Sequence, residues 1–388
     1  MNHRIDEMLE PGSKIGILGG GQLGRMLAVA ATRLGFKSHI FEPAKNSPAS
    51  QVAFQVSTAS YEDEKALIEF AKDVDVITYE FENIPTSALD ILEKIVPIRP
   101  GREALRISQD RIIEKDFLSD LGLKTAPYQL VEDLSSLQTA SKNIGLPAIL
   151  KTTRLGYDGK GQVRLSENSN LEEEYRKLEN HSLVYEGFVD FEFEVSVIAA
   201  RNLSGQVACY DPGQNIHVNG ILHTTTVPSQ LNSKQTIDAV LIASKILESL
   251  NYVGVLGVEL FHTKAGLIVN EIAPRVHNSG HHTLQSCNTS QFEQHLRAIL
   301  GMDLGDSSIK TPTIMYNILG PKTFQGEYNV LFKKQDNIHL KMYGKLESKP
   351  QRKIGHVNVV DVENRGMEEL LKQVEDLKKN LVIEPKES

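Results

Sequence analysis

Short apolar runs alternate with longer segments of helical periodicity along the first hundred residues of the chain. A short apolar run bounded by polar positions is typical of a buried strand, and an apolar period of about 3.6 residues is typical of an amphipathic helix. The runs predict strands at residues 14–18, 38–41, 75–79 and 96–99. The periodic segments predict helices at 23–34, 63–72 and 86–94. This alternation indicates an α/β domain built on a parallel sheet.

The rest of the chain predicts a second α/β region and a smaller end rich in strands. The predicted strands lie at 148–151, 163–165, 182–186, 194–199, 314–319, 339–343 and 354–360. The predicted helices lie at 109–121, 234–250 and 291–299. A chain of 388 residues is too long for a single hydrophobic core. We therefore expect three domains, at 1–103, 104–303 and 304–388.

A hairpin near residue 265 has an unusual charge pattern. Two β-branched runs flank the turn Lys264-Ala265-Gly266, and a turn centred on Ala265 places Glu259 opposite Glu271. Directly opposed like charges destabilise a strand pair, and apolar strands are poor places for unpartnered carboxylates. A hard cation held by oxygen ligands resolves this conflict, with magnesium and a nucleotide phosphate as the leading candidate. The alternative is a solvated hairpin face with two surface glutamates.

Two glycine-rich loops add candidate phosphate sites. Residues 19–24 form a G-x-G-x-x-G turn between a strand and a helix, with Glu42 ending the next strand, as in dinucleotide-binding folds. The turn also suits another phosphorylated ligand, which we favour as a substrate ribose phosphate, or close helix–strand packing alone. Residues 154–162 form a second loop around Lys160, following Lys151 at a strand end. This loop suits a mobile flap over phosphates, or a plain hairpin turn with a solvated lysine.

Composition and charge narrow the class of protein. Forty per cent hydrophobic and 24 per cent charged residues are ordinary for a globular protein, and a net charge of −8 argues against a general nucleic-acid or membrane-surface binder. Two cysteines imply neither a disulfide framework nor a cysteine zinc site. No apolar run approaches the roughly 20 residues of a membrane span, and the first residues lack the apolar core of a signal peptide. We expect a cytoplasmic protein.

Taken together, the motifs resemble those of a known enzyme family. They are Gly19-Gly-Gly-Gln-Leu-Gly-Arg25, Tyr79-Glu-Phe-Glu-Asn83, Gly156-Tyr-Asp-Gly-Lys-Gly-Gln162, Asn270-Glu-Ile-Ala-Pro-Arg275, His277-Asn-Ser-Gly-His281 and Arg352-Lys-Ile-Gly-His356. Over nearly its whole length the chain resembles the ATP-grasp superfamily, and within it the 5-(carboxyamino)imidazole ribonucleotide synthetases of purine biosynthesis.

The resemblance implies a fold and a reaction. The fold is an N-terminal Rossmann-like domain, a central two-lobed ATP-grasp region with a mobile lid at about 126–187, and a small C-terminal domain. The reaction is that of a ligase, in which aminoimidazole ribonucleotide, bicarbonate and ATP give the N-carboxylated ribonucleotide, ADP and phosphate through carboxyphosphate. ATP and Mg²⁺ are implied, biotin is not, and the partners are small molecules and a second copy in a homodimer.

The resemblance also assigns residues to each ligand. The nucleotide site comprises Arg111, Lys151, Gly156, Tyr157, Asp158, Gly159, Lys160, Gly161, Gln162, Glu186, Gly187, Phe188, Val189, Glu194, His217, Asn270 and Glu271. The ribonucleotide site comprises Gln22, Leu23, Glu80, Tyr157, Asn278, Ser279, Lys345, Arg352 and Lys353. Glu259 and Glu271 are assigned to bind magnesium. The residues assigned to the reacting groups are Asp158, Arg275, His277 and Lys353.

The sequence departs from the family's pattern at two positions, and three other functions remain as alternatives. Val276 replaces the family's usual proline, and His282 replaces an aromatic residue and is expected to be a solvated loop histidine. A related formate-dependent glycinamide ribonucleotide transformylase shares the ATP site, although the segment 277–281 favours the imidazole enzyme. A non-catalytic nucleotide sensor and an NAD-dependent oxidoreductase are the other two.

Overall fold

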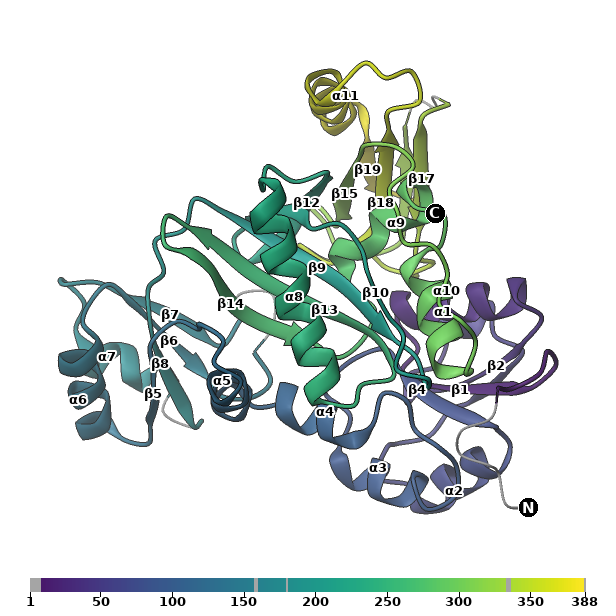
Figure 1. The fold of residues 1–388 in the computed structure, drawn as a ribbon, viewed down its shortest axis with the longest axis horizontal. Helices are drawn as coiled ribbons and strands as arrows, with labels where there is room; N and C mark the ends of the chain where they lie inside the picture. The colour runs from purple at the N-terminus through teal and green to yellow at the C-terminus, as the bar shows by residue number, and fades with distance from the viewer. Residues whose placement is uncertain (1–7, 157–159, 179–180, 333–335, 387–388) are drawn as a thin grey trace.

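A computed structural model describes residues 8–156, 160–178, 181–332 and 336–386 of the chain (Figure 1). The N-terminal part is a parallel sheet in the order β3-β2-β1-β4. Its strands are β1 (Lys14–Leu18), β2 (Lys37–Phe41), β3 (Gln55–Ser57) and β4 (Val76–Tyr79), and its helices are α1 (Gln22–Arg33), α2 (Glu64–Lys72), α3 (Thr86–Leu92) and α4 (Arg102–Ser108). The α/β domain and its parallel sheet are therefore confirmed.

One predicted strand of this domain is wrong. Residues 96–99 make only an isolated parallel bridge, in which Ile98 lies beside Ile77. The amide of Ile77 donates to the carbonyl of Pro97, and the amide of Arg99 donates to the carbonyl of Ile77. Two prolines, Pro97 and Pro100, lack the amide hydrogens that a longer ladder would need.

A small antiparallel sheet stands apart from the rest at one end of the molecule (Figure 1). It has the order β5-β8-β6-β7, from β5 (Tyr128–Val131), β6 (Ala148–Thr152), β7 (Gln162–Leu165) and β8 (Leu183–Gly187). Helices α6 (Leu134–Ile144) and α7 (Leu171–Arg176) complete it. Its own core, around Leu137, Leu150 and Tyr185, makes it a separate lobe.

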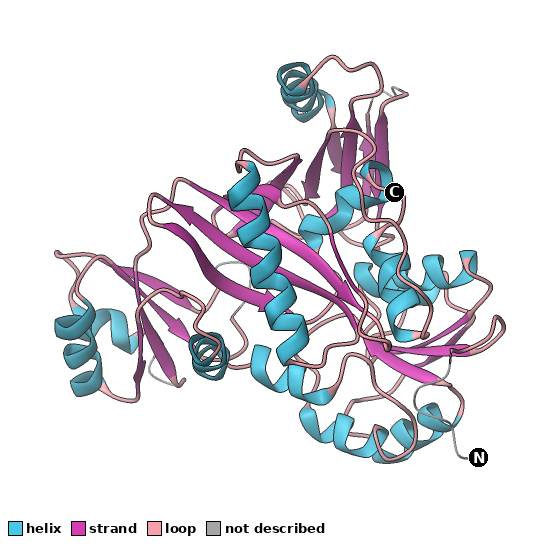
Figure 2. Cartoon of the chain, in the orientation of Figure 1, coloured by secondary structure: helices cyan, strands magenta, loops and turns pink. Residues whose placement is uncertain are grey.

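The largest element is a nine-stranded sheet that crosses the middle of the molecule (Figure 2). Its main path is β14-β13-β9-β11-β12-β15-β18-β17, with β10 paired to β9. The strands are β9 (Phe193–Arg201), β10 (Val207–Cys209), β11 (Gly213–Val218), β12 (Ile221–Val227), β13 (Gly254–Thr263), β14 (Gly266–Ala273), β15 (Thr313–Leu319), β17 (Ile338–Met342) and β18 (Lys353–Val360). The sheet thus joins the central region to the C-terminal one.

Alternation along the central strands gives this sheet one apolar and one polar face. Val195, Val197, Val258 and Leu260 are fully buried in a core that α8 (Ser233–Ser249) covers. A capping box between Asn232 and Gln235 begins α8. The residues between these apolar positions face the other way and form the candidate site.

The remaining elements complete the fold. They are α5 (Arg111–Asp120), the short helices η1 (Ala49–Gln51) and η2 (Asn278–His282), α9 (Thr283–Ser286), α10 (Gln291–Ile299), β16 (Tyr328–Leu331), α11 (Met367–Asn380) and β19 (Val382–Pro385). Helix α10 packs between α1 and strands β9 and β13. The N-terminal domain and the central sheet consequently share one core, which includes Leu27, Ile198 and Leu296.

Candidate active site

The hairpin of β13 and β14 brings two glutamates together. Glu259 lies directly opposite Glu271, which confirms the predicted pairing. The turn itself is Lys264-Ala265, with Thr263 paired to Gly266, so a regular ladder would have placed Asn270 opposite Glu259. A β-bulge after Glu259 absorbs one residue, and both Asn270 and Glu271 then oppose it. The amide Nδ2 of Asn270 lies 3.5 Å from Glu259 Oε2.

Burial and the like charge of their neighbours act on the carboxylates of this hairpin. Burial and then the charge of Glu271 raise the pKa of Glu259 to about 7, against the influence of His217. Burial and Glu271 likewise raise the pKa of Glu114, on α5, to about 8. The charge of Glu271 thus adds to burial in raising the pKa of both neighbouring carboxyl groups. A hard divalent cation fits the donor set of two carboxylates and an amide.

The protein alone does not complete a metal site among the described residues. No group of three or more His, Cys, Asp or Glu side chains there is arranged to hold a metal ion. A magnesium ion between Glu259 and Glu271 would therefore take its other ligands from nucleotide phosphates and water, which is the usual situation for this ion.

Two of the predicted phosphate-binding cations come from different elements, α5 and β6. Arg111 Nη1 lies 3.5 Å from Glu271 Oε2. Lys151, at the end of β6, donates to Glu186 Oε2 at 2.8 Å. Burial lowers the pKa of Lys151, and Glu186 opposes that shift. Arg111, one of the predicted phosphate-binding cations, therefore lies beside a predicted metal ligand, and Lys151 lies close enough to Arg111 to feel its charge.

Sequence reasoning missed Lys115 in this group. Its Nζ lies 3.5 Å from Glu186 Oε1, and the residue is only 1% exposed. Lys115 follows Arg111 by four residues on α5, so both side chains lie on one face of the helix. That spacing is the signal that could have found it. Glu186 therefore contributes a carboxylate between two lysines, in addition to the main-chain role predicted for it.

The strand end after Glu186 is tied to two neighbouring loops. The amide of Gly187 donates to Pro127 O, and the amide of Phe188 donates to Pro147 O. The guanidinium of Arg164 lies 4.5 Å from the centre of the Phe188 ring. Residues 186–189 thus form the junction between the small sheet and the central sheet, where the adenine site is predicted.

Glu194 and His217 form a pair on neighbouring strands. His217 Nδ1 lies 2.6 Å from Glu194 Oε2. Burial opposes protonation of this imidazole, yet Glu194 and Glu259 raise the pKa of His217 overall. The two residues assigned separately to the nucleotide are therefore in direct contact.

The flap is described only at its two ends. Tyr157, Asp158 and Gly159 lie outside the described residues, and their predicted roles remain predictions. Gly161 accepts from the Thr152 amide at 2.8 Å, while Gln162 pairs with Lys151 in the β6–β7 ladder. A Cβ added at Gly156 would lie 3.6 Å from Arg111 Nη2. Gly156, at the start of the flap, consequently lies beside Arg111.

Arg275 and His277 follow β14 directly and lie at the other end of the hairpin. The guanidinium of Arg275 donates to both oxygens of Glu82, with Nε 2.6 Å from Oε2. Burial would raise the pKa of Glu82, but Arg275 and Lys353 hold it below the usual value. His277 Nε2 lies 3.4 Å from Glu259 Oε1. Burial and the positive charges of Arg275 and Lys353 hold the pKa of His277 well below its usual value.

Gly257 explains how His277 reaches the sheet. A Cβ at Gly257 would lie 2.9 Å from His277 Cβ and 3.0 Å from its Cγ. Only a glycine allows the ring to rest on β13 two residues before Glu259. This glycine was not predicted as part of the site.

The predicted substrate residues divide into two groups. Asn278 has both side-chain polar atoms buried without a partner among the described residues, whereas Ser279 Oγ lies 2.8 Å from His277 Nδ1. On the C-terminal side, Lys345 Nζ donates to Lys353 O at 2.7 Å. Arg352 donates to Glu347 O. The structure therefore brings Lys353 and Lys345 together, with Lys353 close enough to influence the pKa values of Glu82 and His277.

Carboxylates occupy the first glycine turn. Gly21 and Gly24 donate to the two oxygens of Glu80, and Gly20 donates to Glu42 at 2.6 Å. A phosphate here would have to displace both carboxylates. The amides of this turn already have protein acceptors, and the ribose phosphate there stays a prediction. The turn fixes Glu80, next to the helix that carries Gln22 and Leu23.

The expectation for His282 is also wrong. His282 is buried and its Nδ1 lies 2.7 Å from Ser286 Oγ. Burial lowers its pKa to about 3, so it neither meets solvent nor titrates near neutrality. Val276, the other departure, is fully buried in the shared core.

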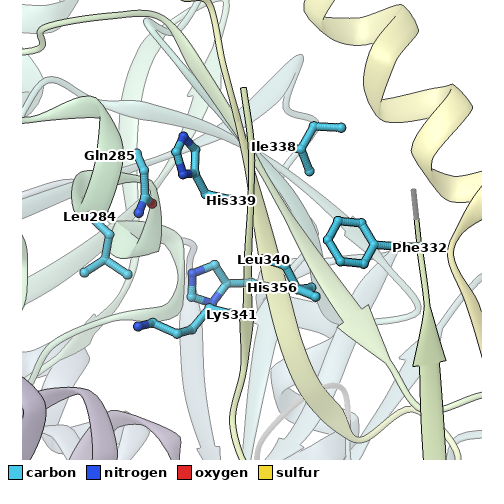
Figure 3. A pocket seen from close by; sticks show the side chains of 8 residues that line it. All are labelled: Leu284, Gln285, Phe332, Ile338, His339, Leu340, Lys341 and His356. Atoms are coloured by element: carbon cyan, nitrogen blue, oxygen red, sulfur yellow. The ribbon is translucent and has the colours of Figure 1, made fainter. Parts of the chain in front are cut away.

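A separate cavity of about 350 Å³ lies beside β17 (Figure 3). It is lined by Leu284, Gln285, Phe332, Ile338, His339, Leu340, Lys341 and His356. None of these residues is among those predicted for the site. In the part of the chain that the structure describes, no helix is both long and apolar enough to cross a membrane.

Comparison with known proteins gives consistent matches along the chain. Residues 12–109 match the ribonucleotide synthetase preATP-grasp domain, residues 116–292 the ATP-grasp domain, and residues 313–370 the phosphoribosylaminoimidazole carboxylase C-terminal domain. An N5-carboxyaminoimidazole ribonucleotide synthase of Brucella melitensis is 49% identical over 352 residues, covering 90% of this chain and 96% of the relative. The Bacillus subtilis synthase is 42% identical, covering 90% and 92%.

Solved structures agree in fold. The synthetase of Staphylococcus aureus complexed with ADP has a TM-score of 0.87 at 35% identity, covering 96% of this chain and 98% of that one. The Aspergillus clavatus synthase in complex with ADP and 5-aminoimidazole ribonucleotide has a TM-score of 0.85 at 29% identity, covering 95% and 98%. With three matched domains and a synthase that is 49% identical over 90% of its length, this chain belongs to the N5-carboxyaminoimidazole ribonucleotide synthase family of ATP-grasp proteins.

Proposed function

We propose that this protein is a ligase that carboxylates 5-aminoimidazole ribonucleotide with bicarbonate at the expense of ATP, releasing ADP and phosphate. The observation that carries the proposal is the opposition of Glu259 and Glu271 on a hairpin that Arg111 and His277 contact. This combination suits phosphoryl transfer, which depends on positioned cations more than on covalent catalysis.

The first step would join bicarbonate to phosphate. A bicarbonate oxygen attacks the γ-phosphorus of ATP, the bond to the β-phosphate oxygen breaks, and ADP leaves with carboxyphosphate as product. Lys151, Lys160 and Arg111 are proposed to hold the phosphates, and Arg275 to compensate developing charge. Mg²⁺ at Glu259, Glu271 and the neighbouring Asn270 would supply charge neutralisation between the phosphates when bound.

The second step would transfer the carboxyl group. The exocyclic amine attacks the carboxyl carbon, of carboxyphosphate or of the carbon dioxide it releases, and phosphate departs as the amine loses a proton. Asn278 supports this proposal, because its buried amide group has no protein partner among the described residues and could bind a polar ligand. The pair Lys345 and Lys353, with Arg352, is proposed to bind the ribonucleotide phosphate. Closure of the flap would exclude water from the reactive acyl phosphate.

The proposal also covers the adenine and ribose of the nucleotide and the oligomeric state of the protein. The main chain of residues 186–189 is proposed to meet adenine, and Glu194 with His217 the ribose. We propose a cytoplasmic homodimer, for which light scattering should give twice the mass of one chain.

The test is ADP formation with each component omitted in turn. Turnover should require bicarbonate, rise strongly with aminoimidazole ribonucleotide and be indifferent to avidin, which removes biotin. Equal ATP hydrolysis with and without that nucleotide contradicts the substrate. Formate with glycinamide ribonucleotide serves as the matched control, and turnover in that mixture alone would instead identify the related transformylase.

A further inference from the structure

A chain of buried hydrogen bonds runs from the centre of the sheet to His277. Thr225 Oγ1 donates to Asn215 Oδ1 at 2.9 Å, and Asn215 Nδ2 donates to Ser196 Oγ at 3.0 Å. Ser196 Oγ donates to Ser279 Oγ at 2.7 Å, and Ser279 Oγ lies 2.8 Å from His277 Nδ1. All five residues are buried, so no bulk water competes for these contacts.

The chain has one direction. The amide nitrogen of Asn215 can only donate, so the Ser196 hydroxyl accepts from it and donates its own hydrogen to Ser279. The Ser279 hydroxyl in turn donates to His277 Nδ1. A second donor, the backbone amide of Ser279, lies 3.4 Å from the same nitrogen. Two donors aimed at Nδ1 require that it carry no hydrogen.

The state of Nδ1 decides the state of the other ring nitrogen. In a neutral imidazole one nitrogen is a donor and the other an acceptor, so His277 carries its hydrogen on Nε2. That nitrogen lies 3.4 Å from Glu259 Oε1. A hydrogen on the ring nitrogen nearest the carboxylate stabilises that carboxylate, whereas a lone pair there would repel it. The orientation of the hydrogen therefore matters for the predicted metal ligand.

We propose that Ser196 and Asn215 are positioning residues, which fix His277 in the tautomer that carries its hydrogen on Nε2, the ring nitrogen nearest Glu259. His277 then acts in carboxylation as a hydrogen-bond donor and does not take the proton of the attacking amine. The catalytic part of this inference rests on the proposed function of the hairpin, whereas the tautomer does not.

The topology explains why Ser196 occupies this place. Ser196 pairs with Glu259 across β9 and β13, and with Gly213 of β11. It therefore lies on the same polar face as the two glutamates, one strand further in. A residue with neither charge nor metal-ligand chemistry carried no signal in the sequence.

The test combines a spectroscopic and a kinetic measurement on Ser196→Ala and Ser196→Thr, with Ser286→Ala as matched control. Ser286 is an equally buried serine whose hydroxyl contacts Nδ1 of another histidine, His282, so its loss reproduces the chemical change away from the site. Long-range ¹H–¹⁵N spectra of histidine-labelled protein report which ring nitrogen is protonated, and the His277 signal is identified by its absence in His277→Gln.

The wild type should show an unprotonated Nδ1 and a protonated Nε2 at His277. Ser196→Ala should populate the opposite tautomer and lower kcat about tenfold or more, with KM for ATP within about twofold, because partners that orient a site histidine typically contribute 10–100-fold. Ser196→Thr should restore both, and Ser286→Ala should change neither.

Each contrary result is decisive. A protonated Nδ1 in the wild type overturns the tautomer, whatever the enzyme's substrate proves to be. A kcat that falls in Ser196→Ala without a change of tautomer assigns Ser196 another role. A tautomer that changes with kcat unaffected removes the catalytic importance of the relay. If the wild type shows the expected tautomer but carboxylates nothing, the proposed function fails and the positioning of His277 stands.

Discussion

Substitution of Glu271 distinguishes a metal-binding role of this residue from a structural one. We predict that Glu271→Gln lowers turnover at least about a hundredfold, because the phosphates lose an anionic metal ligand and transition-state charge goes uncompensated. The free energy of unfolding without metal should be unchanged or higher, since the substitution removes repulsion with Glu259. Denaturation in EDTA and ADP assays in saturating magnesium measure the two effects.

The two effects have opposite signs, so one variant distinguishes the interpretations. A protein that unfolds earlier than the wild type without metal, yet turns over normally in saturating magnesium, would assign Glu271 to the fold.

Glu82 is predicted to hold Arg275 in place. Glu82→Gln removes the charge that compensates a guanidinium whose side chain is only 17% exposed. We expect a loss of about 2 kcal/mol in stability, since breaking a buried pair leaves one charge unpaired. Thermal unfolding measures it, with Glu82→Asp as the charge-preserving control. Equal losses in both variants would show that shape, not charge, is the contribution of Glu82.

At the level of residues, the sequence revealed those whose chemistry conflicts with their setting. Glu259 and Glu271 stood out because carboxylates on apolar strands need an explanation. Lys115, Glu82 and Ser196 did not, because their roles depend on partners 71, 193 and 83 positions away in the chain. Helical spacing from Arg111 was a usable signal only for Lys115.

Among elements, α5 and β14 are joined by a buried carboxylate. Glu114 accepts from the amide of Ile272 at 2.7 Å, and its pKa is raised to about 8. The folded protein therefore binds more protons than the unfolded chain between pH 4.5 and 8, and stability decreases as pH rises through that window. Glu114→Gln keeps an acceptor for Ile272 and removes the charge.

We predict that Glu114→Gln raises the free energy of unfolding at pH 8, without metal, by a few kcal/mol, and by little at pH 5. Urea titrations at the two pH values measure the difference. An equal gain at both would mean that Glu114 titrates normally.

The elements also show where pattern reading works. The long helices at 234–250 and 291–299 and the hairpin were found because their periods are strong, and α10 matches to the residue. Strands β11 and β12 were missed because Gln214, Asn215, His217 and the threonines of 224–226 leave these strands without a clear apolar–polar alternation. A strand whose polar residues serve a site loses the apolar–polar alternation by which strands are predicted.

For the whole molecule, buried histidines predict sensitivity to acid. Burial lowers the pKa values of His282, His295 and His356 each to about 3. Below about pH 6.5 the unfolded chain binds protons that the folded protein excludes, so each histidine lowers stability by up to about 1.4 kcal/mol per pH unit. Above that pH these histidines take nothing from the free energy of unfolding, and below it the free energy falls progressively toward pH 3.

Glu114 and Glu259 act with the opposite sign over part of this range, so a single-site variant gives the clearer measurement. His295→Gln should reduce the slope of unfolding free energy against pH, between pH 5 and 6, by about 1.4 kcal/mol per unit. His339→Gln serves as the control, because His339 occupies an exposed position on β17. An unchanged slope in His295→Gln would show that His295 is charged in the folded protein.

The order of strands in the nine-stranded sheet has a consequence for synthesis on the ribosome. Strand β12 ends at Val227, but its outer partner β15 begins only at Thr313. At the usual ~5–20 residues per second, β12 waits roughly five to twenty seconds with an unpaired edge. Such an edge can pair with a neighbouring nascent chain. The strand pair β12–β15, which joins the central strands to the C-terminal region, is therefore a place where a chaperone would protect the unfinished protein.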